Sequence, residues 1–171
     1  MYPCLDFAQC ACEKDKIALA YEIFCQDFIQ SQCFLNTILI TPKCHNKLQK
    51  ENLEIEESFW HIISRKNANL RYFDEQRAKR IQWVRRIIND YNKPHIKMFY
   101  FYESDGRIRL YLWLYAHDFV VILEKITTKN NTAFIVTSFY VDNDKKRQSF
   151  ARKYNDYINR VDLRLMGCEW F

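Results

Sequence analysis

Glycine is scarce in this chain of 171 residues, which contains only Gly106 and Gly167. The phosphate-binding loops of P-loop enzymes and of dinucleotide-binding domains need several closely spaced glycines, because their backbone must approach the phosphates without a Cβ atom. Nucleotide-dependent enzymes of these two classes are therefore excluded.

Long apolar stretches are also missing. The longest run, residues 110–116, is far shorter than the roughly 20 residues that a membrane-spanning helix needs. Residues 1–15 lack the basic start and the apolar centre of a secretory signal peptide. We therefore expect a cytoplasmic protein with reduced thiols and no membrane partner.

Residue patterns typical of metal or nucleophilic catalysis are absent as well. The chain has no H-E-x-x-H, G-x-S-x-G or Cys–His nucleophile signature, and the His and Asp residues of its second half are scattered. Cys10 and Cys12 form a C-x-C pair, but no second close pair follows at zinc-finger spacing. A zinc site made by Cys4, Cys10, Cys12 and either Cys44 or His45 stays open as an alternative, and otherwise we expect no metal and no cofactor.

Charge is distributed unevenly along the chain. Residues 1–60 contain five Lys/Arg and nine Asp/Glu, a net charge of −4, whereas residues 61–171 contain 21 basic and 12 acidic residues, a net charge of +9. The positive charge of residues 61–171 could serve to bind a polyanionic partner, or it could be ordinary charge that keeps the protein in solution. We divide the chain into an acidic, Cys-rich helical front, 1–55, packed on a basic α+β core, 56–171.

The apolar pattern predicts an α+β fold, with N-terminal helices followed by a four-stranded antiparallel sheet and a C-terminal helix. Residues 15–33 and 74–91 have helical spacing, and Asp74 can cap the second helix. Residues 107–117 alternate as a strand does, after a turn that contains Gly106. The other expected elements are a short strand over 34–42, a short helix over 43–52, strands over 95–103, 119–127 and 133–141, and a last helix over 143–161.

A histidine precedes a run of arginines within residues 59–90. The imidazole of His61 could take a proton from a ribose hydroxyl or give one to a leaving oxygen, or it could be a hydrogen-bonded structural residue. Arg77 lies at the centre of the apolar arc of the helix over 74–91, and Arg80 lies near its edge. Their guanidinium groups must therefore bind carboxylates, bind a phosphate or bend back to the rim of the helix. Arg65, four residues after His61, is a further candidate for binding substrate.

Two strands carry the other candidates. Thr137, Ser138 and Tyr140 place hydroxyl donors on the last strand, where they could bind phosphate or orient a base, although such residues are also ordinary in strands. Arg107 and Arg109 begin a strand face that Trp113 continues, between Tyr111 and Tyr115. Basic residues beside aromatic rings suit single-stranded nucleic acid. Without such a role, this face would lie beneath a helix.

These motifs together resemble the Barnase–EndoU–colicin–RelE-like (BECR) superfamily of nucleases, in particular its phage- and toxin-associated members. The resemblance covers about residues 55–145 and depends on "FWHIISR", "FDEQRAKRIQWVRRII", four antiparallel strands and "VTSFYV" on the last strand. It implies a metal-independent endoribonuclease that cleaves RNA by attack of the 2′-OH and leaves a 2′,3′-cyclic phosphate.

The resemblance also implies roles for individual residues. His61 would be the general acid/base, Arg77 and Arg80 would hold the phosphate with Arg109 as a further candidate, and Thr137 or Ser138 would complete the site with Tyr140. The partners would be RNA and a cognate inhibitor or immunity protein. The alternative is a non-catalytic module that binds nucleic acid or protein with the same basic face.

Overall fold

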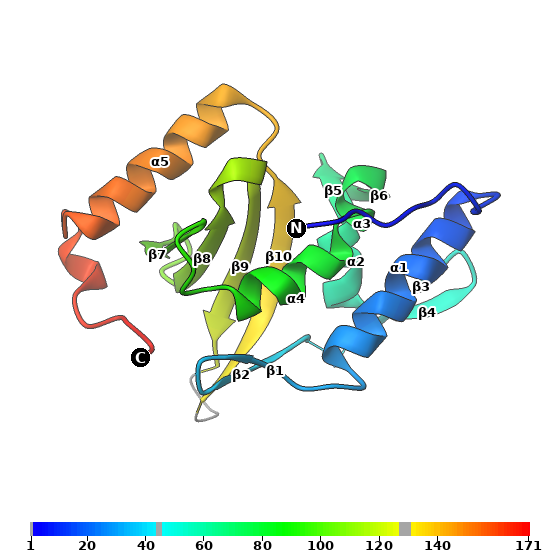
Figure 1. The fold of residues 1–171 in the computed structure, drawn as a ribbon, viewed down its shortest axis with the longest axis horizontal. Coiled ribbons are helices and arrows are strands. Elements are labelled where there is room, and N and C mark those ends of the chain that lie inside the picture. The colour runs from blue at the N-terminus through cyan, green and yellow to red at the C-terminus, as the bar shows by residue number, and fades with distance from the viewer. Residues whose placement is uncertain (1, 44–45, 127–130) are drawn as a thin grey trace.

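Helices cover both faces of a six-stranded sheet (Figure 1). The computed structural model describes residues 2–43, 46–126 and 131–171. Within them the strand order is β1-β2-β10-β9-β8-β7, and the hairpins β3-β4 and β5-β6 are separate from this sheet. The elements are α1 (Glu13–Phe28), β1 (Cys33–Leu35), β2 (Ile38–Thr41), β3 (Lys47–Lys50), β4 (Leu53–Glu56), α2 (Glu57–Ile63), β5 (Ser64–Asn67), β6 (Leu70–Phe73), α3 (Glu75–Ala78), α4 (Ile81–Asn89), β7 (Ile96–Tyr102), β8 (Ile108–Leu114), the 3-10 turn η1 (Tyr115–His117), β9 (Phe119–Lys125), β10 (Thr132–Tyr140), α5 (Asp144–Ile158) and the 3-10 turn η2 (Leu163–Leu165).

The α+β class and the four strands predicted for the second half are confirmed. These strands are β7–β10, which pair antiparallel in the order β10-β9-β8-β7. Gly106 has φ of +81° in the turn before β8, a conformation that L side chains rarely adopt. Asn143 caps α5, since its side chain accepts a hydrogen bond from the Lys146 N–H at 2.9 Å.

The sheet is larger than predicted, and it is mixed. One strand was expected over 34–42, but the chain turns at Asn36, which has φ of 54°, and forms β1 and β2 instead. Asparagine tolerates this left-handed region better than most residues. β2 then lies parallel to β10, with Leu39 opposite Thr132. The prediction of a four-stranded, purely antiparallel sheet is therefore wrong, because the sheet has two more strands and one parallel pairing.

Two further predictions of helices need correction. The prediction of a short helix over 43–52 is wrong, because β3 and β4 form a hairpin over most of this range. Residues 44–45 lie outside the part that the structure describes. Its two-residue turn, Glu51 and Asn52, has φ of 50° and 62°, which is typical of a tight hairpin. The helix over 74–91 is divided into α3 and α4 at Lys79 and Arg80. Asp74 caps α3 as expected, accepting from the Arg77 N–H at 3.2 Å.

Two apolar cores lie on the two faces of the sheet. One fills the space between the sheet and α1, α2 and α4, and includes Phe24, Ile62, Ile87 and Leu112. The other lies beneath α5, drawn in orange in Figure 1, where Phe150 meets the rings of the β7–β8 pair. The front of the chain takes part in the first core through α1, and it extends the sheet through β1 and β2.

Candidate functional site

A cationic cleft of about 420 Å³, here called the central cleft, lies where the β5-β6 hairpin, the end of β10 and the start of α5 meet. Its chemistry-bearing lining residues are His61, Arg65, Lys66, Arg71, Arg77, Thr137, Tyr140, Asp142 and Lys146. The structure thus brings together five predicted residues from the four elements α2, β5, α3 and β10, namely His61, Arg65, Arg77, Thr137 and Tyr140.

The last turn of α2 and a β-bulge in β10 position the imidazole. The register of β10 against β9 shifts between Ile135 and Thr137, so Val136 is an extra residue in the ladder. Bulges commonly redirect side chains at functional sites. Thr137 Oγ1 donates to the His61 carbonyl oxygen at 3.2 Å and so ties β10 to α2. The His61 side chain stays about one third exposed, at 32%.

The cations of the cleft are only partly paired with carboxylates. Arg65 lies 3.0 Å from Asp74 and 2.9 Å from Asp142, and Lys146 lies 2.8 Å from Asp142. Arg77 donates to the Ser64 carbonyl at 2.7 Å and lies 3.6 Å from Asp74. Five positive charges therefore face two carboxylates, and an anion that enters the cleft meets net positive charge.

Arg71 is the cation with the most unused hydrogen-bonding capacity. Its Nη1 donates to Ser64 Oγ at 3.4 Å, and no carboxylate of the described residues lies within 4.0 Å of its guanidinium. Burial lowers the pKa of Arg71 and of Arg77 without neutralising them, since an arginine stays charged far above neutral pH. The Nε atom of Arg77 is also buried without a hydrogen-bond partner among these residues. Both groups have lost hydration that a bound phosphate would replace.

The imidazole of His61 is biased toward its neutral form. Its pKa lies below the ordinary value of 6.5, chiefly because burial disfavours the charged ring and because the Arg71 guanidinium repels a second positive charge. Lys43 adds to this effect, and Glu57, whose carboxylate lies 3.7 Å from the ring, opposes it. A neutral imidazole at physiological pH can act as a general base.

Two substitutions should move the pKa of His61 in opposite directions. Arg71→Met removes a repelling positive charge and should raise this pKa, whereas Glu57→Gln removes the favourable carboxylate and should lower it further. An NMR titration of the ring protons checks both. The titration of His95, which does not line the cleft, serves as the internal control. Shifts of the same sign in both variants would contradict the electrostatic assignment.

Two predicted residues lie close to the cleft without lining it. Arg80 donates to the carbonyl and to the side chain of Gln76, at 2.6 Å and 3.0 Å, and its guanidinium lies 5.3 Å from the centre of the Tyr140 ring. It therefore supports Tyr140 instead of facing a ligand. Ser138 is fully buried, and its Oγ has no hydrogen-bond partner among the described residues.

Three predicted residues on β8 do not reach the cleft. Arg107 and Arg109 pair with Glu124, at 3.0 Å and 2.8 Å, and with Asp105 in the turn before β8. Trp113 is fully buried and packs on Phe150 of α5, with ring centres 5.9 Å apart. The expectation that Trp113 stacks on substrate is wrong, because this strand face lies beneath a helix.

Three cations of the cleft, Lys66, Arg71 and Lys146, were not among the predicted site residues. Lys66 and Arg71 are register partners in the β5-β6 hairpin, and so extend toward the same face. The hairpin turns at Ala68, which has φ of 52°, so the glycine or Asn-Gly signal of a tight turn is missing. Lys146 enters from the first turn of α5, and only the folded chain brings it near His61.

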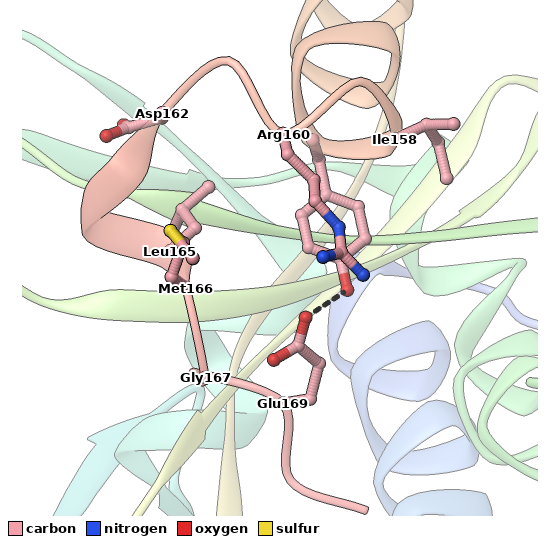
Figure 2. Close-up of a pocket in the computed structure, with 8 residues that line it drawn as sticks. Ile158, Arg160, Asp162, Leu165, Met166, Gly167 and Glu169 are labelled. Atoms are coloured by element: carbon pink, nitrogen blue, oxygen red, sulfur yellow. Dashed lines mark hydrogen bonds between the residues drawn. The ribbon is translucent and has the colours of Figure 1, made fainter.

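A separate hollow of about 280 Å³ lies at the C-terminal end of α5 (Figure 2). Ile158, Leu165 and Met166 line it with Arg160 and Glu169, and the Tyr157 hydroxyl donates to Glu169 Oε1 at 3.4 Å, the bond dashed in Figure 2. None of the predicted site residues lines this hollow. It contains neither a histidine nor a cluster of cations, so the central cleft is the better candidate for phosphate chemistry.

No cluster of three or more His, Cys, Asp or Glu able to hold a metal occurs in the described part of the chain. The zinc alternative involves Cys44 or His45, which lie outside this part. None of the helices over the described residues is long and apolar enough to cross a membrane. Comparison of the chain with protein-family models, with curated proteins and with solved structures finds no match.

Proposed function

We propose that the protein is a metal-independent endoribonuclease that acts at the central cleft. One observation carries the proposal: an imidazole with a lowered pKa lines the same cavity as five cationic side chains. RNA needs no metal for such cleavage, because its own 2′-OH is held next to the phosphate that it attacks. The protein has to supply a base, a proton donor and positive charge.

The proposed reaction assigns each step to a group in the cleft. His61 takes the proton from the 2′-OH as the 2′-oxygen bonds to phosphorus. The bond between phosphorus and the 5′-oxygen then breaks, which gives a 2′,3′-cyclic phosphate and a free 5′-OH. Tyr140, whose side chain is 37% exposed at the cleft, is the hydroxyl that we assign as the proton donor to the leaving 5′-oxygen.

We assign Arg71 and Arg77 the stabilisation of the charge of the phosphorane. Their N–H groups are fixed by the β5-β6 hairpin and by α3, and each keeps hydrogen-bonding capacity that the protein does not use. Donors fixed before the reaction stabilise developing charge without having to reorganise. Arg65 and Lys146, which share Asp142, then raise the local concentration of the polyanion.

A cleavage assay in EDTA tests the proposal. The wild-type protein should cut a labelled RNA without added metal and release products ending in a 2′,3′-cyclic phosphate. Arg71→Met should lower kcat/KM by about 10²-fold, the usual cost of removing one fixed donor to a developing oxyanion. The matched control is Arg107→Met, since Arg107 is paired with Glu124 outside the cleft and its loss should leave cleavage near wild type. Cleavage that stops in EDTA, or equal losses in both variants, would overturn the proposal.

A second candidate function is a binding module that does not cut. The cleft contains a single histidine, and an RNase without a second group able to transfer protons would bind RNA without turning it over. Under this alternative no product forms, and affinity falls linearly on a log–log plot against salt, as the release of counterions predicts. The EDTA assay therefore also separates the two functions.

A further inference from the structure

Two other hollows adjoin the central cleft and share residues with it. One, here called the Tyr72 hollow, has a volume of about 400 Å³ and shares Arg65 with the cleft. The other, here called the Phe134 hollow, has a volume of about 210 Å³ and shares His61 and Val136 with it. The three cavities therefore follow one another across the surface, with the imidazole and the cations in the middle.

The Tyr72 hollow offers an exposed aromatic ring beside a guanidinium. Tyr72 is 54% exposed on β6, and Arg65 is its register partner on β5, so both side chains extend from one face of the hairpin, opposite to the face of Lys66 and Arg71. Arg65 lines both the Tyr72 hollow and the central cleft and so joins the two. Leu70, on the same face as Tyr72, is 63% exposed. Apolar surface of this kind is costly to leave in water, and an exposed aromatic ring next to a cation is a typical platform for an unpaired base.

The acidic residues of the Tyr72 hollow are already neutralised. Glu75 lies 2.7 Å from Lys16 and 2.6 Å from Lys79. These two lysines hold the pKa of Glu75 at about 2, well below its ordinary range. Asp74 lies 3.0 Å from Arg65. The charge that repels a polyanion is therefore compensated along this side of the hairpin.

The Phe134 hollow combines an apolar wall with one cation, Lys43, and one carboxylate, Glu57, which lies 3.7 Å from the His61 ring. Phe134, Ile135 and Val136 form the wall, and Lys43 lies 3.8 Å from the centre of the Phe134 ring. A nucleotide has the matching chemistry, since its base is flat and apolar on its faces and its phosphate is anionic.

We propose that the three hollows form one binding track for single-stranded RNA, in which an unpaired base next to the scissile phosphate stacks on Tyr72. This inference rests on the proposed function, because it assigns the substrate class of the same cleft. Duplex RNA is excluded from the track, since a base can lie flat on Tyr72 only when it has left its own stack.

A binding experiment that needs no catalysis tests this inference. The probe is a short single-stranded oligonucleotide, 2′-O-methylated at every position so that it cannot be cleaved. Tyr72→Thr removes the ring but keeps a strand-forming residue, and should weaken binding by about 5- to 100-fold. Tyr72→Phe keeps the ring and should bind like the wild type. Phe34→Thr is the matched control, because Phe34 is also an exposed aromatic residue on a strand, 44% exposed, and lines none of the three hollows.

The outcomes separate the two proposals. If Arg71→Met weakens binding and Tyr72→Thr does not, the track is overturned, the hairpin becomes a candidate for protein contact, and the cleft keeps its role. A 2′-O-methylated duplex that binds the wild type as tightly as the single strand would also overturn the track. If the probe binds all variants equally, the track fails and Arg71 does not hold phosphate in the ground state, whereas the proposed function is decided by the cleavage assay in EDTA.

Discussion

Replacing His61 with alanine should lower kcat for RNA cleavage by about 10²- to 10⁴-fold, the usual contribution of a general base. The ring is about one third exposed, and the nearest carboxylate, that of Glu57, lies 3.7 Å away. Removing the ring therefore leaves no buried polar group unpaired, and the fold should be kept. The affinity for a 2′-O-methylated oligonucleotide should therefore stay near the wild-type value, because the cations that bind phosphate are unchanged. Cleavage assays at saturating substrate, together with a fluorescence titration for binding, measure the two effects separately.

His117→Ala is the matched control for this substitution. His117 is an exposed histidine on η1 that contacts Trp83 and lies outside the cleft, so its loss should leave cleavage within about twofold of wild type, as expected for a surface change away from the site. If both variants cleave equally well, the imidazole of His61 has no catalytic role, and another group of the cleft must take the proton from the 2′-OH.

The pH profile of the wild type should follow from the same group. The neutral form of His61 is the active one, so the rate should rise with pH through a pKa below 6.5 and be level at neutral pH.

Stability should change with pH in the same direction as the rate. The unfolded chain binds a proton at this histidine more readily than the folded chain does, so the free energy of unfolding falls as the pH drops from about 6.5 through the lowered pKa.

The parts of the fold that could be predicted are those in which side-chain periodicity alone decides the structure. β8 alternates along its whole length, and α5 has a capping asparagine and one buried aromatic residue, so both could be located from the sequence. The three missed turns, at Asn36, at Glu51 with Asn52, and at Ala68, have positive φ without a glycine. In a chain with only two glycines, the usual signal for such turns is missing, and the short strands beside them were not recognised.

The candidate site could be predicted only in part for a related reason. His61, Arg77 and Thr137 could be selected one by one, because each residue has chemistry that suits a phosphate. The selection failed for Trp113, since alternation shows that a strand has two faces but does not show that helices cover both of them. Arg71 was not selected, because its position beside His61 depends on the hairpin that the sequence did not reveal.

Replacing Phe150 with alanine should lower the free energy of unfolding by about 3–5 kcal/mol, the usual cost of deleting a buried aromatic side chain. Phe150 is the buried residue of α5, and its ring lies within 6.4 Å, between centres, of the rings of Phe99, Tyr111, Trp113 and Phe139. Tyr154 and Tyr157 pack beside it but are only partly buried, so the Phe150 contact contributes most to holding the helix, and with it Lys146, against the sheet. Urea unfolding followed by circular dichroism gives the loss. Ile158→Ala, at a position on the same helix that is 55% exposed, should change stability by no more than about 0.5 kcal/mol. Alanine favours a helix more than phenylalanine or isoleucine does, so a loss of similar size in both variants would mean that the packing of Phe150 stabilises α5 no more than an exposed position does.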